Sequence, residues 1–212
     1  MPDSAELNRK PYVSVLRAAA ASERRERVVA AATQSLREDG GLGRFSLDSV
    51  AKAAGVTRLT VYNQFGSRGG LLEAVFDDIA ARGGLATIPQ ALSLPDPLQG
   101  LDAIIDRFCE FWSSDEAIAR LHDAMATDAD LAIALTLRNE RRRRLLQALM
   151  RRLVPADMPA RQRRDAIDFV YAMTSFAMFR ILGSNRSAAA VAQLIKTSCR
   201  AVLGAAAPTP ST

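Results

Sequence analysis

A short polar stretch, Thr57 to Gln64, carries side chains whose types fit the edges of DNA bases. Read as a helix at about 100° per residue, its apolar edge is formed by Val61 and Phe65, and Asn63 points directly away from that edge. An Asn amide can form two hydrogen bonds with adenine, and apolar groups can contact the methyl group of thymine. Four residues are therefore expected to face the major groove: Leu59, Thr60, Tyr62 and Asn63.

Side chains near the ends of the same short helices are expected to reach the DNA backbone or neighbouring bases. The Tyr62 hydroxyl and the guanidinium groups of Arg58 and Arg68 suit phosphate oxygens. The remaining candidates for this interface are Arg44, Ser46, Thr57 and Gln64. Because phosphate contacts supply much of the affinity for DNA, we expect binding to weaken steeply with salt.

Two short helices, joined by a tight turn and followed by a longer helix that ends near Arg82, must position these side chains. Ser46 is a good N-cap, Asp48 places negative charge in the first turn, and Gly55 supplies the left-handed residue that ends the helix. Thr57 is the next N-cap candidate. Apolar residues repeat at i, i+3, i+4 and i+7 in the first helix: Leu47, Val50, Ala51 and Ala54. This pattern predicts a helix-turn-helix unit, whose second helix fits the major groove.

A structural helical hairpin with a polar outer face is the alternative interpretation of the same pattern. Such a hairpin gives no reason for an apolar Leu59 on the outer face, whereas a thymine methyl does. The DNA-binding interpretation is therefore preferred.

The segment from Phe45 to Leu72 resembles the DNA-binding domain of TetR-type (tetracycline-repressor-like) bacterial transcriptional regulators. The resemblance is carried by SLDSVAKAAGV, TRLTVYNQF and GSRGGLL, and it extends over residues 22–82. The matching positions are Ala51, Ala54, Gly55, Val56, Thr57, Thr60, Tyr62, Phe65, Ser67, Leu71 and Leu72. It implies a homodimer with a divergent helical regulatory domain. Leu59, Asn63–Gln64 and Gly69–Gly70 depart from the pattern, and the two glycines are expected to weaken the first turn of the next helix.

The second half of the chain contains a long expected helix, residues 128–154, whose apolar stripe is interrupted by polar residues. Arg138, Asn139 and Arg142 fall where Leu is expected, and the run Arg141 to Arg144 must spread around the helix. At least one of these arginines therefore points inward unless its head group bends out to water. One explanation is pairing with a carboxylate, with three candidates: Asp106, Glu110 and Asp168.

The second explanation is that these polar residues form one end of a ligand cavity with apolar walls. The candidate ligand-binding residues are Phe108, Trp112, His122, Met125, Arg138, Asn139, Arg142, Met173 and Phe176. His122 is open to a plainer role as a hydrogen-bonded structural histidine. Both explanations of the polar interruption remain open from the sequence.

The sequence offers no catalytic or metal constellation. The row Asp102, Asp106 and Glu110 lies on one helix face, but a di-metal bundle site needs a Glu-x-x-His pattern that the single histidine cannot supply. Cys109 and Cys199 lack metal spacing and are expected to be buried free thiols in a reducing cytoplasm. We therefore expect no cofactor, no metal and no enzymatic activity.

The 212-residue chain is long enough for two domains, and its charge does not by itself predict a nucleic-acid partner. Residues 1–85 have 12 basic and 10 acidic side chains, net +2, and the remainder has 16 and 13, net +3. No apolar run reaches the length of a membrane helix, so no membrane partner is expected. The expected order is a tail at 1–21, the helix-turn-helix domain at 22–84, a linker with three prolines at 85–97, a regulatory and dimerisation domain at 98–204, and a disordered tail at 205–212.

We expect an all-α fold throughout. Ser22 is expected to cap the first helix, and one helix is expected to run from Pro159 to about Gly183. Because that helix is apolar on nearly every side, a second copy of the chain is expected to cover it together with the last helix, residues 187–203.

These features predict a homodimeric repressor that binds a pseudo-palindromic operator and is released by a small-molecule ligand in the C-terminal domain. A DNA-bound scaffold without a small-molecule effector is the alternative. A polar, filled core around Arg138 would favour the scaffold, and an apolar cavity would favour the sensor.

Overall fold

The computed structural model describes residues 9–38 and 41–205, with side chains for residues 17–38 and 42–204. Every regular element in these ranges is a helix, which confirms the all-α prediction. The predicted tail at 205–212 and the first eight residues lie outside the described residues, apart from the helical Ala205. The chain forms two compact units, Met1–Asp78 with Ala119–Leu131 and Ile79–Ile118 with Ala132–Thr212. Three helices pass from one unit into the other, and the predicted domain limits stay a prediction.

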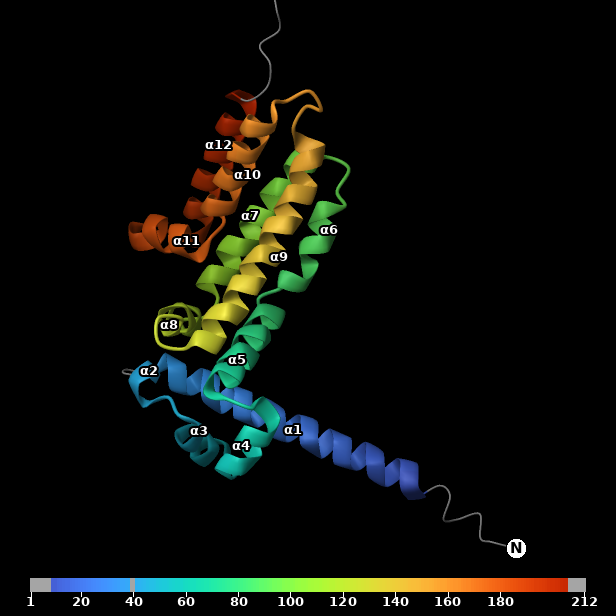
Figure 1. Cartoon of the computed structure of the whole chain (residues 1–212), viewed down its shortest axis with the longest axis vertical. Helices are drawn as coiled ribbons and strands as arrows, with labels where there is room; N and C mark the ends of the chain where they lie inside the picture. The colour runs from blue at the N-terminus through green and yellow to red at the C-terminus, as the bar shows by residue number, and fades with distance from the viewer. Residues whose placement is uncertain (1–8, 39–40, 206–212) are drawn as a thin grey trace, which may run out of the picture. The chain divides into compact units, whose positions relative to one another are not determined.

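The first unit begins with the long helix α1 (Arg9–Arg37), which packs against α2 (Gly41–Arg44) and α3 (Leu47–Ala54). The short helix α4 (Arg58–Phe65) follows α3, and α5 (Arg68–Arg82) begins in this unit (Figure 1). The unit's core is formed by fully buried apolar side chains: Val28, Ala32, Leu36, Val50, Val61, Leu71, Leu72 and Val75. Helix α8 (Ala117–Ala124) ends in this unit, and α9 (Ala129–Leu153) starts there.

The second unit is organised around α7 (Pro97–Ser113), which packs against α6 (Ile88–Leu92), α11 (Phe176–Leu182) and α12 (Ala188–Ala205). The other elements of this unit are a 3-10 turn, η1 (Leu85–Thr87), α10 (Ala160–Met173), and a second 3-10 turn, η2 (Gly183–Asn185). The expected inward residues of α7 are all buried: Leu101, Ile104, Ile105, Phe108, Phe111 and Trp112.

The first helix begins thirteen residues earlier than predicted, at Arg9, and the prediction that Ser22 caps it is wrong. The Ser22 hydroxyl instead donates to Glu26 one turn later, at 3.0 Å. Ala18–Ala21 extends the helix upstream because Ala is the best helix former. Pro11 lies in the first turn, where backbone N–H groups have no partner within the helix, and is therefore tolerated.

The predicted linker contains the short helix α6, with Pro89 in its first turn, where proline suits a helix. The predicted single helix from Pro159 to Gly183 is also interrupted. It breaks at Thr174–Ser175 into α10 and α11, which are bent by 64°. The Thr174 hydroxyl bonds back to the carbonyl oxygens of Val170 and Tyr171, and the Ser175 hydroxyl caps α11 by accepting from Met178. These local bonds compete with a continuous helix.

No single helix among the described residues is both long and apolar enough to cross a bilayer. Taken together, α10 and the segment Phe176–Asn185 meet that condition on length and composition only, a property that the buried core helices of other folds share.

Candidate functional site

The two short helices are set by strong local signals. Ser46 and Ser49 form a reciprocal capping box at the start of α3, with the Ser46 hydroxyl accepting from the Ser49 backbone at 3.1 Å. Gly55 ends α3 in the left-handed conformation at φ +66°. Thr57 then caps α4 by accepting from the Thr60 backbone at 3.1 Å. The predicted caps and the predicted turn are therefore confirmed.

The outer face of α4 presents three of the four predicted base-reading residues. Val61 is fully buried on the opposite edge, while Leu59 is 65% and Tyr62 56% exposed, and Asn63 is exposed beside them. Thr60 is half-buried, and its hydroxyl lies 2.9 Å from that of Thr57. Leu59 and Tyr62 form the apolar part of this exposed face.

Among the predicted flanking residues, Arg44, Thr57 and Arg58 are exposed and Ser46 and Gln64 are half-buried. The Ser46 and Thr57 hydroxyls serve mainly as helix caps. Arg58 lies 3.4 Å from Asp48, but both side chains are about two-thirds exposed or more. Such an exposed ion pair is weak, so it leaves Arg58 able to exchange Asp48 for a phosphate.

Arg25 helps to position α4, a role that the sequence analysis missed. Its guanidinium lies 4.5 Å from the centre of the Phe65 ring and donates to the carbonyl oxygen of Gln64 at 3.3 Å. A cation at the C-terminal end of α4 is favourable because the last carbonyl groups carry partial negative charge. Arg25 lies 39 positions before Gln64, so no local pattern reveals this contact. It fastens α1 to the end of α4.

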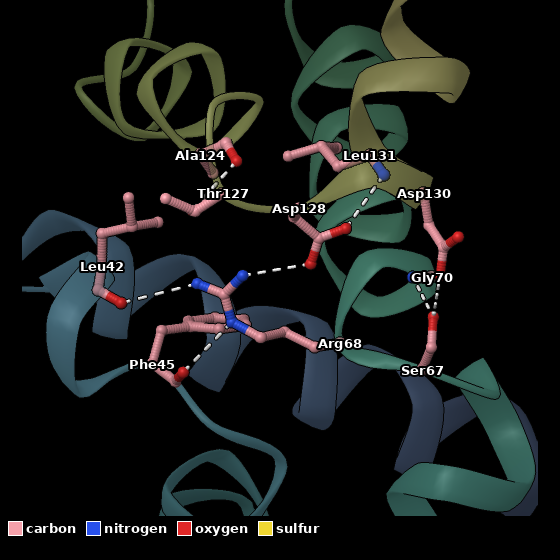
Figure 2. A network of polar contacts seen from close by, with 10 residues as sticks. All are labelled: Leu42, Phe45, Ser67, Arg68, Gly70, Ala124, Thr127, Asp128, Asp130 and Leu131. Atoms are coloured by element: carbon pink, nitrogen blue, oxygen red, sulfur yellow. Dashed lines mark hydrogen bonds and ion pairs between the residues drawn. The ribbon is translucent and has the colours of Figure 1, made fainter.

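Arg68 has a structural role in addition to the predicted phosphate contact (Figure 2). Its guanidinium points into the first unit, where Nη1 donates to Asp128 Oδ2 at 3.1 Å and Nε donates to the Phe45 carbonyl at 3.3 Å. Nη2 reaches the Leu42 carbonyl at 3.5 Å, and the group lies over the Phe45 ring. With three of its five N–H donors used inside the protein, Arg68 holds the start of α5 in place, and its predicted phosphate contact stays a prediction.

The same region explains Gly69 and Gly70. A Cβ at Gly69 would lie 2.7 Å from both Asp128 Oδ1 and the Asp130 Cβ. A Cβ at Gly70 would lie 2.1 Å from the carbonyl oxygen of Phe65. The glycines are therefore required by close approach of neighbouring chain segments, a reason that outweighs their poor helix propensity.

Several candidate ligand residues meet in the second unit around Trp112. The Trp112 ring lies 5.6 Å from the Phe176 ring and 6.0 Å from the Phe108 ring, measured between centroids. Its indole N–H donates to the carbonyl oxygen of Thr174 at 3.1 Å. The structure therefore brings three predicted aromatic residues together at the break between α10 and α11.

Arg142 is the buried member of the arginine run, with only 6% of its surface exposed. Its Nη1 donates to the Tyr171 carbonyl at 3.2 Å and to the Thr174 hydroxyl at 3.0 Å. The guanidinium also lies 4.3 Å from the Tyr171 ring centre and 5.7 Å from that of Phe108. Burial lowers the pKa of Arg142 from its ordinary value, and Tyr171 opposes this shift. Its Nε–H has no hydrogen-bond partner among the described residues.

Within the arginine run the predicted pairing occurs at Arg143, which pairs with Asp168, whereas for the buried Arg142 the pairing prediction is wrong. Asp168 pairs with Arg143, Asp106 with Lys196 and Glu110 with Arg107. Arg142 instead occupies the C-terminal end of α10, where helix carbonyl groups and two aromatic faces compensate its charge. The acidic row on α7 is likewise an ion-pairing face, since Asp102 pairs with Arg200.

The other candidate ligand residues are less buried. Arg138, Asn139 and Met173 are half-buried in the second unit, and Arg138 donates to the Ala134 carbonyl at 3.2 Å. His122 and Met125 are half-buried in the first unit. A single cavity shared by all nine candidates therefore stays a prediction. A surface pocket of about 440 Å³ lies elsewhere in the second unit, between Asp96, Leu153 and Leu203.

The thiols and carboxylates of the described residues show no reactive arrangement. Burial raises the pKa of Cys109 from 9.0 to about 11 and that of Cys199 from 9.0 to about 12, with nearby carboxylates adding to both shifts. Such thiols hold little nucleophilic thiolate at neutral pH. No group of three or more potential metal ligands occurs among the residues that the structure describes.

Residues 29–75 match the sequence model of a family described as bacterial regulatory proteins, tetR family. No curated protein matches the chain significantly. Among solved structures, the fold is similar to FadR from Bacillus subtilis in complex with stearoyl-CoA, with a TM-score of 0.66 and 12% identity over 82% of this chain and 96% of that chain.

Two further structures have a similar fold. NalD, the secondary repressor of the MexAB-OprM multidrug efflux pump in Pseudomonas aeruginosa, gives a TM-score of 0.63 and 20% identity over 86% of this chain and 96% of that chain. A TetR transcription regulator from Haloarcula marismortui gives a TM-score of 0.60 and 16% identity over 87% of this chain and 98% of that chain. At these identities the likeness concerns the fold.

Proposed function

We propose that the chain is a homodimeric, sequence-specific repressor of transcription, because residues 29–75 match the tetR family of bacterial regulatory proteins. The observation that carries the proposal is the outer face of α4, where exposed Leu59, Tyr62 and Asn63 stand opposite the buried Val61. In this proposal Asn63 bonds a base edge, Leu59 contacts a thymine methyl, and Tyr62 holds a phosphate. The protein acts by occupying DNA, without catalysis or a cofactor, in the cytoplasm.

Apolar outer faces on α10 and α12 support a homodimer. Phe169 and Met173 are half-buried and Ala172 is exposed on α10, while α12 exposes Leu194 and Ala190. The Leu194 residue has 37% of its surface exposed. Small and apolar side chains on two neighbouring helices suit close packing against the same helices of a second copy. A dimer places two α4 helices in successive major grooves about 34 Å apart.

Selection of bound duplexes from a random pool, followed by sequencing at two salt concentrations, tests this function. We expect an inverted repeat whose half-sites are centred about one helical turn apart. Asn63→Ala should relax preference at particular base pairs, and Tyr62→Phe should weaken binding to all sequences about equally. Sequence-blind binding by the parent protein would contradict the proposed function. Equal losses on operator and random DNA for both variants would remove Asn63 as a base reader.

We further propose that a small-molecule effector binds in the second unit near Trp112 and Arg142 and favours a conformation that releases DNA. The support is a buried guanidinium with an unused N–H beside an aromatic cluster. FadR, one of the similar folds, was solved with stearoyl-CoA, which agrees with such a site but does not identify the effector of this chain. Arg142 already stabilises the end of α10, so the alternative is a DNA-bound scaffold with no effector.

A further inference from the structure

The segment Arg17–Arg27 of α1 is exposed outside the core of the first unit and contacts the end of α4 through Arg25. All eleven side chains from Arg17 to Arg27 are exposed, and burial begins only at Val28. The helix itself starts at Arg9 and therefore extends well before the segment matched by the family model, residues 29–75. Burial of side chains therefore does not explain why α1 continues over residues 17–27.

The composition of the segment keeps it helical without packing. Ala18–Ala21 are the strongest helix formers, and the segment continues from the packed residues Val28 to Leu36. Because extending a formed helix costs far less than starting one, the packed part stabilises the exposed part. The small alanine side chains also leave the helix slender, so a partner can approach closely.

Three arginines of the segment form one basic sector. At about 100° per residue, Arg17, Arg24 and Arg27 fall within about 80° of the helix surface, and Glu23 lies about 40° outside this sector. Glu26 lies on another side and accepts from Ser22. Within the described part of the chain, the three arginines have no ion pair, whereas the exposed Arg161 and Arg200 of the second unit do.

Arg25 fixes this segment relative to the base-reading helix. Its contacts with Gln64 and Phe65 at the end of α4 hold α1 beside α4 at that point. From there α1 continues past α4 toward the N-terminal end, as Figure 1 shows, and Arg17 lies about 12 Å further along the helix axis than Arg25. The arginine-bearing segment therefore begins beside the end of α4 and extends away from it along the axis of α1.

We propose that the segment Arg17–Arg27 of α1 is a second DNA contact, which binds the phosphate backbone next to the half-site read by α4. Arg17, Arg24 and Arg27 supply the charges, and Arg25 sets their position. This inference rests on the proposed function for its place on DNA. It adds phosphate contacts to the base contacts of α4, so it raises affinity and salt dependence without adding sequence preference.

The test is the salt dependence of binding by the full chain carrying Arg17→Ala, Arg24→Ala and Arg27→Ala together. Each lost phosphate contact should reduce the slope of log affinity against log salt by about 0.9. Hydroxyl-radical footprints on the selected operator should lose protection at the flanks and keep it over the half-sites. The matched control is Arg141→Ala, Arg151→Ala and Arg164→Ala, which removes the same charge from exposed positions of the second unit and should leave the slope unchanged.

The variant with Arg17→Lys, Arg24→Lys and Arg27→Lys should keep most of the slope of log affinity against log salt, because the contact is with phosphate charge. An unchanged slope in the alanine variant, or a lysine variant that behaves like the alanine variant, would overturn the proposal. The measurement is repeated on random duplex, where phosphate contacts persist without an operator. A failure to select any operator would thus contradict the proposed function alone, while the slope on random DNA still decides the role of α1.

Discussion

Gly70 shows at the scale of one residue how packing overrides propensity. Helix propensity alone predicts that Ala at this position in α5 would gain about 1 kcal/mol over Gly. A Cβ there would overlap the carbonyl oxygen of Phe65 at 2.1 Å, and that backbone atom cannot move without displacing the end of α4. The overlap must therefore decide the sign of the substitution.

We predict that Gly70→Ala lowers the free energy of unfolding by about 1 to 3 kcal/mol, the usual cost of overpacking. Urea unfolding followed by circular dichroism measures this change. The matched control is Gly204→Ala in α12, where a Cβ meets nothing within 4 Å and up to about 1 kcal/mol should be gained. A Gly70→Ala variant at least as stable as the parent would show that the α4–α5 turn is looser than described.

Asp128 joins two elements of the first unit. Its Oδ1 accepts from the Leu131 backbone at 3.0 Å and so caps α9, while its Oδ2 accepts from Arg68 in the first turn of α5 (Figure 2). Ser67, the cap of α5, donates to Asp130 at 3.4 Å beside it. The starts of α5 and α9 are thus tied by an ion pair that is 30% exposed at Arg68 and 11% exposed at Asp128.

We predict a coupling free energy of about 1 to 2 kcal/mol between Arg68→Met and Asp128→Asn in a double-mutant cycle of stability. Asn preserves the cap of α9, so the cycle isolates the ion pair. The control cycle uses Arg161 and Asp165, an exposed pair at 3.9 Å whose coupling should be below about 0.5 kcal/mol. Equal coupling in the two cycles would mean that Arg68 is not an organising residue.

For the whole molecule, the proposed function requires that ligand binding in one unit be linked to DNA binding in the other. Helices α5, α8 and α9 each have residues in both units. A displacement of one of these helices in one unit therefore also moves residues of the other unit. Trp112 is the single tryptophan and lies in the proposed effector site, which makes its fluorescence a local reporter.

We predict that a small-molecule probe that releases operator DNA also changes Trp112 emission over the same concentration range. The reason is that a ligand can shift the equilibrium only through its preference for one conformation. Arg142→Met should shift both curves to higher probe concentration. Matched unfolding curves for parent and variant control for lost stability. DNA release without any change in emission would place the effector away from Trp112, and neither effect with any ligand class would favour the scaffold.

Helix caps, the left-handed turn residue and the buried faces of helices could be predicted from the sequence, because each depends on residues close together in the chain. The caps at Ser46 and Thr57, the left-handed Gly55 and the outer face of α4 all follow from residues within one or two turns of each other. The inward face of α7 follows from its period for the same reason. Such signals survive because cap and helix energies act over neighbouring residues.

The partners of the long cationic side chains could not be predicted from the sequence and are visible in the tertiary structure. Arg25 meets Gln64 at a separation of 39 positions, Arg68 meets Asp128 at 60, and Arg142 meets Thr174 at 32. The break between α10 and α11 belongs with them, because Trp112 and Arg142 bind the groups that this break exposes. A guanidinium on a flexible stem can reach many partners, so its choice depends on which distant carbonyl or carboxylate groups the folded chain brings within reach.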